Sequence, residues 1–170
     1  MNQPLHIIRW PDPRLKKASD AVATFDDDLR RTAEQMLVLM RAAKGVGLAA
    51  PQVGINRKLF VMNHTGQPGD DRVYVNPTLV ALDGEAVVAE EGCLSLPDIH
   101  IDVVRPSHVR IEAQTLDGEP ITVERDGFEA RVWQHENDHL LGILLTDRMG
   151  FSDKMRHRRR LRELETKFKK

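Results

Sequence analysis

The chain has 170 residues, of which 41% are hydrophobic and 30% are charged, and its formal net charge is −1. That length suffices for one domain with a hydrophobic core, and that composition excludes a fibrous or disordered chain. No apolar run approaches the roughly 18 residues that a membrane span requires, so we expect no membrane partner.

The small net charge conceals an uneven distribution. From Asp153 to Lys170, nine Lys or Arg residues stand against three Asp or Glu residues, so this end of the chain is strongly basic. Cys93 is the only cysteine, which excludes an internal disulfide. It is a small buried side chain, a nucleophile or a metal ligand. The first residues show no apolar signal core, so we expect a cytoplasmic protein.

The N-terminal part is predicted to be a lead-in followed by a helix. Pro4, Pro11 and Pro13 indicate an extended, turn-rich start. A helix is predicted from about residue 26 to residue 44, because acidic residues favour its N-terminus and apolar residues recur at helical spacing. Gly45 stands where a C-terminal cap is expected. The apolar stripe consists of Leu29, Ala33, Met36, Leu37, Met40 and Ala43.

The segment from Gly45 to Gly54 reads GVGLAAPQVG. Gly45 and Gly47 indicate a backbone that another group must approach closely. The segment lacks the third glycine of a dinucleotide-binding fingerprint, and no helix is expected to follow because Pro51 blocks one. It also lacks the Gly-Lys-Ser/Thr of a phosphate-binding loop. We therefore interpret it as a tight loop.

The middle of the chain is predicted to form strands. Residues 58–63 are apolar and end in a turn-rich segment. Residues 72–80 follow, and Pro77 within them indicates an edge or a bend. Asp83-Gly84 predicts a hairpin turn that leads into a strand at residues 85–90.

The last two predicted strands are joined by a clear turn. Residues 109–114 alternate apolar and polar side chains, which is typical of a half-buried strand. Asp117-Gly118 turns this strand toward the next one, which contains Ile121 and Val123. Short spacings with hairpin turns favour antiparallel pairing of all these strands.

Two helices are predicted in the C-terminal part. One runs from about Asp126, which with Glu129 makes a capping box, to Gly142. The other starts near residue 152, with Met155, Leu161, Leu164 and Phe168 on it. We therefore expect an α+β fold in a single catalytic domain over residues 1–170. In this fold, mostly antiparallel sheets pack around a central metal-binding helix, with an N-terminal helix and a basic C-terminal helix at about residues 152–168.

The predicted helix that ends at Gly142 contains the motif H-E-x-x-H, formed by His135, Glu136 and His139. Residues four apart share one face of a helix, so both imidazoles could bind one metal ion. Glu136 would then lie close enough to exchange a proton with a water molecule activated by the metal. An exposed polar helix with two histidines by coincidence is the alternative.

A catalytic metal site usually has three protein ligands, so a third is needed. Glu163 and Glu165 could serve as a downstream acidic ligand, but they stand in a strongly basic segment. A third histidine six residues after His139 is excluded, because that position is Leu145. Cys93 is the remaining candidate, and its thiolate suits a soft or borderline ion.

Three segments of the chain resemble the three motifs of peptide deformylase, in the same order and with similar separations. They read GVGLAAPQ at 45–52, EGCLS at 91–95 and QHENDHL at 134–140. Ile8–Ser19 also looks like the start of that family, so the resemblance covers nearly the whole chain. Three coordinated motifs are far more specific than H-E-x-x-H alone.

The resemblance implies a hydrolase that removes the formyl group from the N-terminal formylmethionine of new polypeptides and releases formate. It implies that Cys93, His135 and His139 hold one divalent ion, Fe²⁺ in the cell, with Zn²⁺, Ni²⁺ or Co²⁺ as substitutes. Glu136 would move the proton. The side-chain amide of Gln52 and the backbone N–H of Leu94 would stabilise the negative oxygen.

The resemblance also implies a substrate pocket. With helical spacing, it favours Val46, Phe128 and Val132 as residues around the methionine side chain. The segment from Gly45 to Gly47 would hydrogen-bond the substrate backbone as an added strand does. Arg131 shares the same helix face, and its stem could line the pocket while its head reaches solvent.

Two residues are expected to support the site. Glu91 is predicted to pair with Arg105 and to hold the loop that carries Cys93, as the resemblance implies. A surface pair of little consequence is the alternative. Asp138 either supports the metal ligands or hydrogen-bonds nearby backbone, and the sequence leaves these two roles open.

Other functions remain open at this point. An endopeptidase of the H-E-x-x-H type would not need the Gln52 loop, and an RNA-binding module would carry a degenerate metal site. The intact ligand set argues against such a module. The basic C-terminal helix is a solvated surface or a docking element for ribosomal RNA, since the family acts on chains leaving the ribosome.

Overall fold

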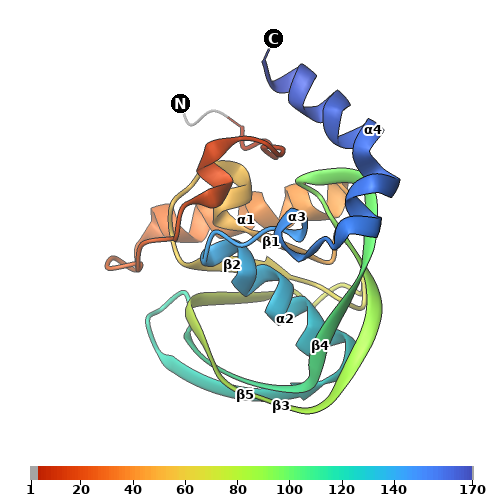
Figure 1. Cartoon of the computed structure of the whole chain (residues 1–170). Helices are drawn as coiled ribbons and strands as arrows, with labels where there is room; N and C mark the ends of the chain where they lie inside the picture. Colours follow the sequence, from red (N-terminus) through yellow and green to blue (C-terminus); the bar gives the residue numbers. More distant parts are fainter. Residues whose placement is uncertain (1–3, 170) are drawn as a thin grey trace.

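The computed structural model describes residues 4–169 as one five-stranded antiparallel sheet with helices packed on it (Figure 1). Residues 1–3 and Lys170, which belong to the predicted domain and its basic end, lie outside the described residues. The strands are β1 Gly47–Ala49, β2 Leu59–Met62, β3 Arg72–Cys93, β4 Leu96–Gln114 and β5 Pro120–Asp126. The helices are the 3₁₀ turns η1 Pro13–Lys16 and η2 Ala50–Val53, and α1 Asp27–Ala42, α2 Gly127–Leu140, α3 Leu145–Arg148 and α4 Phe151–Phe168.

The sheet has the simple order β1-β2-β3-β4-β5, and all neighbouring strands are antiparallel. The long strands β3 and β4 curve around α2, which lies in the middle of the molecule and contacts all five strands (Figure 1). The predicted α+β fold, with an antiparallel sheet around the central helix, is therefore confirmed. The buried side chains of α2, with Trp133 completely buried among them, form the centre of one core cluster.

The predicted hairpin at Asp83-Gly84 is wrong. β3 continues through these residues, and its pairing with β4 shifts in register between Asp83 and Ala86. Gly84 has a φ of 78°, so it provides the left-handed residue of an irregularity within one strand rather than of a turn between two. The strand also shifts register between Val75 and Thr78, which confirms the bend expected at Pro77.

The N-terminal helix is confirmed with one difference at its end. Asp26 caps α1, because its carboxylate accepts a hydrogen bond of 3.0 Å from the backbone N–H of Leu29. The left-handed residue after the helix is Lys44, with a φ of 57°, and not Gly45. The buried residues of the stripe are Leu29, Ala33, Met36 and Met40.

Local sequence signals were less reliable at η2 and at the start of α2. A 3₁₀ turn follows β1 despite Pro51, because proline is tolerated in the first turn, where no N–H donor is needed. The expected capping box of α2 does not form. Asp126 is at the N-cap position, but its carboxylate binds Nδ1 of His108 at 2.9 Å, and Glu129 binds Arg125 at 3.1 Å. Gly142, with a φ of 73°, follows the end of α2 as predicted.

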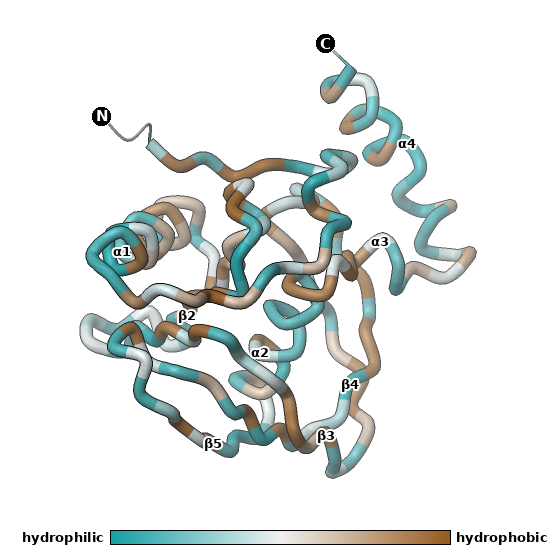
Figure 2. Tube along the Cα trace, turned by 90° about the vertical axis from the view of Figure 1, so that its left-hand side faces the viewer, coloured by the Kyte–Doolittle hydropathy of each residue, from teal (hydrophilic) through white to brown (hydrophobic). Residues whose placement is uncertain are grey.

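The C-terminal helix α4 projects from the body of the molecule and carries mostly hydrophilic residues (Figure 2). Leu164 is its one buried side chain among the described residues, and Leu161 is partly buried beside it. Met155 and Phe168, two other apolar residues of this helix, are about half exposed. In the part of the chain that the structure describes, no helix is both long and apolar enough to cross a membrane.

Candidate metal centre and substrate cavity

The structure brings Cys93, His135 and His139 together. The two histidines are four residues apart on α2, and Cys93 is the last residue of β3. One ligand atom from each of the three lies within 4.8 Å of the others, and Cys93 Sγ is 3.3 Å from Nε2 of His139. One thiol and two imidazoles in this arrangement can hold a single metal ion and leave a coordination position open.

The pKa values of the two imidazoles are shifted in opposite directions. Burial lowers the pKa of His135, but hydrogen bonds to Cys93 and Glu91 outweigh burial and raise it well above its usual value. Burial lowers the pKa of the neighbouring His139 well below its usual value, and the charge of His135 lowers it further. A thiol beside two imidazoles, with a carboxylate behind one of them, is a donor set that binds a divalent ion once the ligands give up their protons. These residues therefore fit a divalent ion.

Glu91 supports His135 from behind. Its carboxylate accepts hydrogen bonds from Arg105 at 2.6 and 2.9 Å, which confirms the predicted pair, and from Nδ1 of His135 at 3.0 Å. Burial alone would raise the pKa of Glu91, but Arg105 and His135 hold it well below its usual range. The ionised carboxylate keeps the proton of His135 on Nδ1, so Nε2 is available as a ligand.

Glu136 is almost fully buried, and its Oε2 has no hydrogen-bond partner among the described residues. Burial raises the pKa of this carboxyl group to about 7. A carboxylate with this pKa can accept a proton and release it again near neutral pH. A Cβ atom at Gly47 would lie 2.5 Å from Oε1 of Glu136, so a larger residue there would displace the Glu136 side chain. At Gly45, a Cβ atom would lie 2.6 Å from Leu94, which confirms that other groups approach both glycines closely.

Gln52 is directed at the same site from η2. The backbone N–H of Ala49 donates to Oε1 of Gln52 at 2.8 Å, which leaves the Nε2 group facing the site. That group lies 3.2 Å from Oγ of Ser95 and 3.6 Å from Sγ of Cys93. Leu94 follows Cys93 in the tight turn between β3 and β4. Both predicted donors therefore stand beside the metal ligands, and Ser95 is a partner that sequence reasoning missed.

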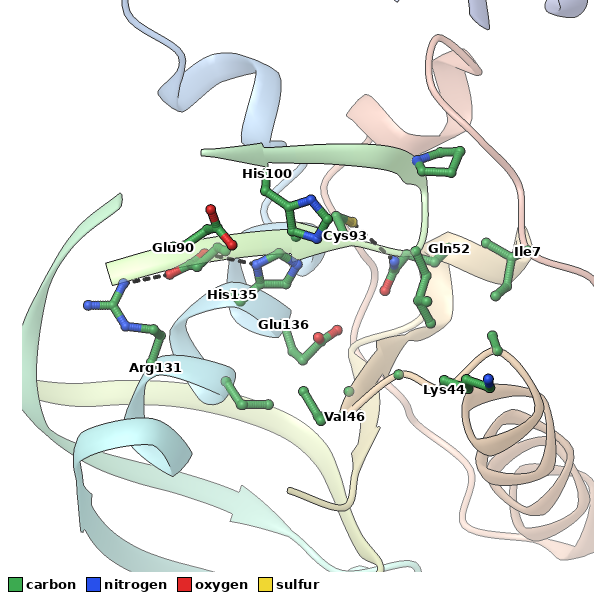
Figure 3. A pocket seen from close by; sticks show the side chains of 18 of the residues that line it. Ile7, Lys44, Val46, Gln52, Glu90, Cys93, His100, Arg131, His135 and Glu136 are labelled. Carbon is green, nitrogen blue, oxygen red and sulfur yellow. Dashed lines mark hydrogen bonds and ion pairs between the residues drawn. The ribbon is translucent and has the colours of Figure 1, made fainter. Parts of the chain in front are cut away.

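A cavity of about 610 Å³ opens in front of these residues (Figure 3). Its volume is in the usual range of small-ligand sites. All five predicted substrate-binding residues line it, namely Gly45, Val46, Gly47, Phe128 and Val132. Val46 and Phe128 are partly exposed, with 39% and 55% of their surface accessible. An incoming apolar side chain would cover them.

The prediction for Arg131 is correct for its position on the cavity wall and wrong for its guanidinium group. Arg131 lines the cavity, but its guanidinium group does not reach solvent, and only 9% of the residue is exposed. Asp138 binds Arg105 at 3.0 Å and Arg148 at 2.7 Å, so it supports the pair beneath the ligands through side chains. Sequence reasoning also missed several polar residues of the cavity wall, because they come from separate segments: Arg9, Lys44, Glu90 and His100.

The other candidates for a third ligand are excluded by the arrangement of α4. Glu163 forms ion pairs with Arg159 and Arg160, both at 3.1 Å, on the surface of that helix. Glu165 is exposed, and Leu145 is buried in a hydrophobic cluster. Cys93 is therefore the residue that joins the two histidines.

The α2 helix with its two histidines, the cysteine from the strand beside it and the buried glutamate define a class of protein. It is the class of H-E-x-x-H proteins, built to hold one metal ion next to a proton acceptor. The family model of polypeptide deformylase matches residues 4–155, which leaves most of α4 outside the match. The chain belongs to the peptide deformylase family.

Individual relatives agree with this assignment. Over 97% of its length the chain is 44% identical to the chloroplastic peptide deformylase 1B of Oryza sativa subsp. japonica, and over 95% it is 40% identical to the peptide deformylase of Chromobacterium violaceum. The chain spans 62% of the rice protein and 96% of the bacterial one. A plant peptide deformylase crystal structure, 39% identical, superposes with a TM-score of 0.93 over 99% of this chain and 92% of that one.

Proposed function

We propose that this chain, acting as one catalytic domain over residues 1–170, removes the formyl group from N-terminal formylmethionine and releases formate. The observation that carries the proposal is the convergence of three features on one cavity. They are a Cys-His-His group that fits a metal ion, a buried carboxyl group with a pKa of about 7, and the amide of Gln52. Metal dependence is a property of the family to which the chain belongs.

The chemistry is hydrolysis of an amide. Cys93, His135 and His139 would hold a divalent ion, which would supply Lewis acidity to polarise a carbonyl oxygen and to lower the pKa of a water molecule. Glu136 takes a proton from water while the water oxygen bonds to the formyl carbon. The carbonyl oxygen becomes negative, and the amide of Gln52 and the N–H of Leu94 donate hydrogen bonds to it. Glu136 then gives its proton to the amine nitrogen as the C–N bond breaks.

The substrate is held by the cavity walls. The side chain of the first methionine contacts Val46, Phe128 and Val132, and binding is favoured because it covers the exposed apolar surface of Val46 and Phe128. The backbone from Gly45 to Gly47 pairs with the extended peptide. Because the backbone at both glycines lies close to the side chains of Leu94 and Glu136, this wall stands directly beside the catalytic groups.

The ion in the cell is Fe²⁺ under this proposal. A thiolate with two imidazoles also accepts Zn²⁺, Ni²⁺ and Co²⁺, so the donor set alone does not select one of them. Metal analysis of the protein purified without oxygen decides the point. Iron below one tenth of the bound metal would overturn the choice of Fe²⁺.

Formate release from a formyl-Met peptide, with and without a chelator, tests the activity. We expect release that the chelator abolishes and that added divalent ion restores, with no cleavage of internal peptide bonds in the mass spectrum. Internal cleavage would support an endopeptidase, and binding of RNA without any formate release would support a nucleic-acid-binding module. Either result would overturn the proposal.

The cellular setting belongs to the proposal as well. The substrates are nascent chains in the cytoplasm, and α4 docks on ribosomal RNA through its basic residues. The exposed position of Arg159, whose side chain is 92% accessible, favours such contacts. We expect that deletion of residues 152–170 weakens co-sedimentation with ribosomes and that binding of the full chain falls with salt. Binding that is unchanged by the deletion and insensitive to salt would contradict it.

A further inference from the structure

Arg131 is a buried cation one helical turn before His135. Its Nη1 donates to Oε1 of Glu91 at 2.8 Å and to the carbonyl oxygen of Val103 at 2.9 Å. Its Nη2 donates to the carbonyl oxygen of Val87 at 2.7 Å. Figure 3 shows the side chain on the cavity wall, with its ion pair to the carboxylate that binds His135. One guanidinium group therefore joins α2 to both long strands and to the support of a metal ligand.

The geometry requires an arginine rather than any positive charge. Val87 is on β3 and Val103 is on β4, so the two carbonyl groups come from different strands. The planar guanidinium group presents several donors in fixed directions and can bind a carboxylate and two carbonyls at once. A lysine ammonium group is a single compact donor centre on a flexible stem. It cannot reproduce this set of contacts.

The position of Glu91 depends on two arginines that act differently. Arg105 contacts both carboxylate oxygens of Glu91 and also binds Asp138, away from the cavity. Arg131 contacts only Oε1 of Glu91, and its Nη1 and Nη2 groups also donate to the backbone carbonyls of Val103 and Val87. Arg131 thus ties the carboxylate to the strands, and Oε2 is left to accept from Nδ1 of His135.

We propose that Arg131 is a positioning residue for the metal centre. It fixes the carboxylate of Glu91, a residue of β3, through its own contacts with the backbone of Val87 and Val103, and Glu91 in turn orients the imidazole of His135 so that Nε2 is directed at Cys93 and His139. This role rests on the metal site of the proposed function and extends it to a residue that contacts no ligand atom directly. Groups that hold a metal-binding histidine in this way typically change metal affinity or activity by about 10–100-fold when removed.

The test uses the full chain with three substitutions. Arg131→Met keeps the length of the stem and removes all donors, and Arg131→Lys keeps the charge but not the fork of donors. Arg125→Met is the matched control, because Arg125 stands just before α2 and forms a surface pair with Glu129 at 3.1 Å. The probes are Zn²⁺ affinity, measured by chelator competition, and the visible absorption spectrum of the protein loaded with Co²⁺. Circular dichroism confirms that each variant is folded.

We expect Arg131→Met to bind Zn²⁺ about 10-fold or more weakly and to change the Co²⁺ spectrum. Arg125→Met should match the unmodified chain, and Arg131→Lys should recover only part of the affinity. A loss below about threefold, or an unchanged Co²⁺ spectrum, in folded Arg131→Met would overturn the proposal. If Arg131→Met does not fold, the same criteria apply to Arg131→Lys. Failure of both to fold would also overturn it, because Arg131 would then be required by the fold itself.

The readouts separate this proposal from the proposed function. Metal affinity and the Co²⁺ spectrum do not require deformylation. If the chain binds Zn²⁺ but releases no formate, the proposed activity is wrong. The metal affinities of the Arg131 variants would still decide the role of Arg131. Normal formate release with an unaffected Arg131→Met metal site would count against the positioning role alone.

Discussion

Two glutamates, each paired with two arginines, occupy opposite environments in this molecule. Glu91 binds Arg105 and Arg131 beneath α2, and its side chain is 5% exposed. Glu163 binds Arg159 and Arg160 on α4, and its side chain is 42% exposed. In both cases the arginines hold the pKa of the carboxyl group below its usual range. The two sets of ion pairs have similar partners, but one set is buried and the other is exposed to solvent.

The difference shows where charge has consequences in this chain. Water screens the pairs of α4, so their geometry can change at little cost. Beneath α2 the charged side chains are buried, so each charged group depends on the others for solvation. The orientation of His135 can therefore be controlled through a carboxylate in the interior, whereas the ion pairs of Glu163 lie at the surface, where Arg160 also binds Asp98.

Among substitutions of the buried charged residues on and beneath α2, Glu136→Gln is expected to cause the largest loss of activity. Formate release should fall by about 10²–10⁴-fold, because the amide cannot accept the proton of water. The fold should persist, since burial already raises the pKa of this carboxyl group to about 7. Glu165→Gln on α4 is the control and should release formate at the unmodified rate. Equal rates for Glu136→Gln and the unmodified chain would remove the proton-transfer role.

Glu91→Gln compares the two glutamates directly with Glu163→Gln. We expect Glu91→Gln to lower the free energy of unfolding by about 3–5 kcal/mol, because two buried arginines lose their carboxylate. Glu163→Gln should leave the midpoint of urea unfolding unchanged, since water solvates its arginines. Urea unfolding followed by circular dichroism measures both. Similar midpoints for the two variants would show that the buried ion pairs of Glu91 contribute no more to stability than the exposed ion pairs of Glu163.

The pH dependence of stability should reveal the same contrast. The pKa of Glu91 is lower in the folded chain than its usual value of 4.5, so the unfolded chain binds more protons in acid. Its contribution is therefore complete above pH 4.5 and is lost as the pH falls toward the pKa of the folded state. The stability difference between the unmodified chain and Glu91→Gln should shrink below pH 4.5. A constant difference from neutral to acidic pH would contradict this assignment.

The smallest expected effect is at the start of α4. Phe151 is 82% exposed, so Phe151→Ser should change the free energy of unfolding by no more than about 0.5 kcal/mol. Leu164 on the same helix is 3% exposed, and Leu164→Ala should cost about 2 kcal/mol through lost burial and a residual cavity. The midpoints of thermal unfolding of the two variants test both expectations. A larger loss for Phe151→Ser would mean that the start of α4 packs against the body.

Much of the fold could be predicted because its signals are local. The apolar spacing of α1, the alternation at residues 109–114 and the turn at Asp117-Gly118 each describe a short segment, and the structure confirms them. Asp83-Gly84 carries the same kind of turn signal, but the strand continues there. A left-handed glycine serves a hairpin or a bulge equally well. The pairing of this segment with Pro106 and His108 on β4 decided between them.

The candidate site divides in a similar way. The spacing of His135 and His139 predicted a metal-binding pair, and Cys93 remained as a candidate third ligand that the family resemblance supported. Arg131 could not be interpreted correctly, because arginine stems often lie along apolar surfaces while the heads reach water. Its burial depends on two carbonyl groups of the curved strands that no local pattern indicates.

The sequence by itself determined which functional groups are available and which of them share a helix face. A thiol, two imidazoles and a carboxyl group have the same chemistry in any fold, and residues four apart are neighbours on every helix. Only the tertiary structure decided that Cys93 meets the histidines, that Arg131 is enclosed and that Glu136 has a pKa of about 7. These properties depend on removal from water and on partners brought from distant segments, and both arise only when the chain is folded.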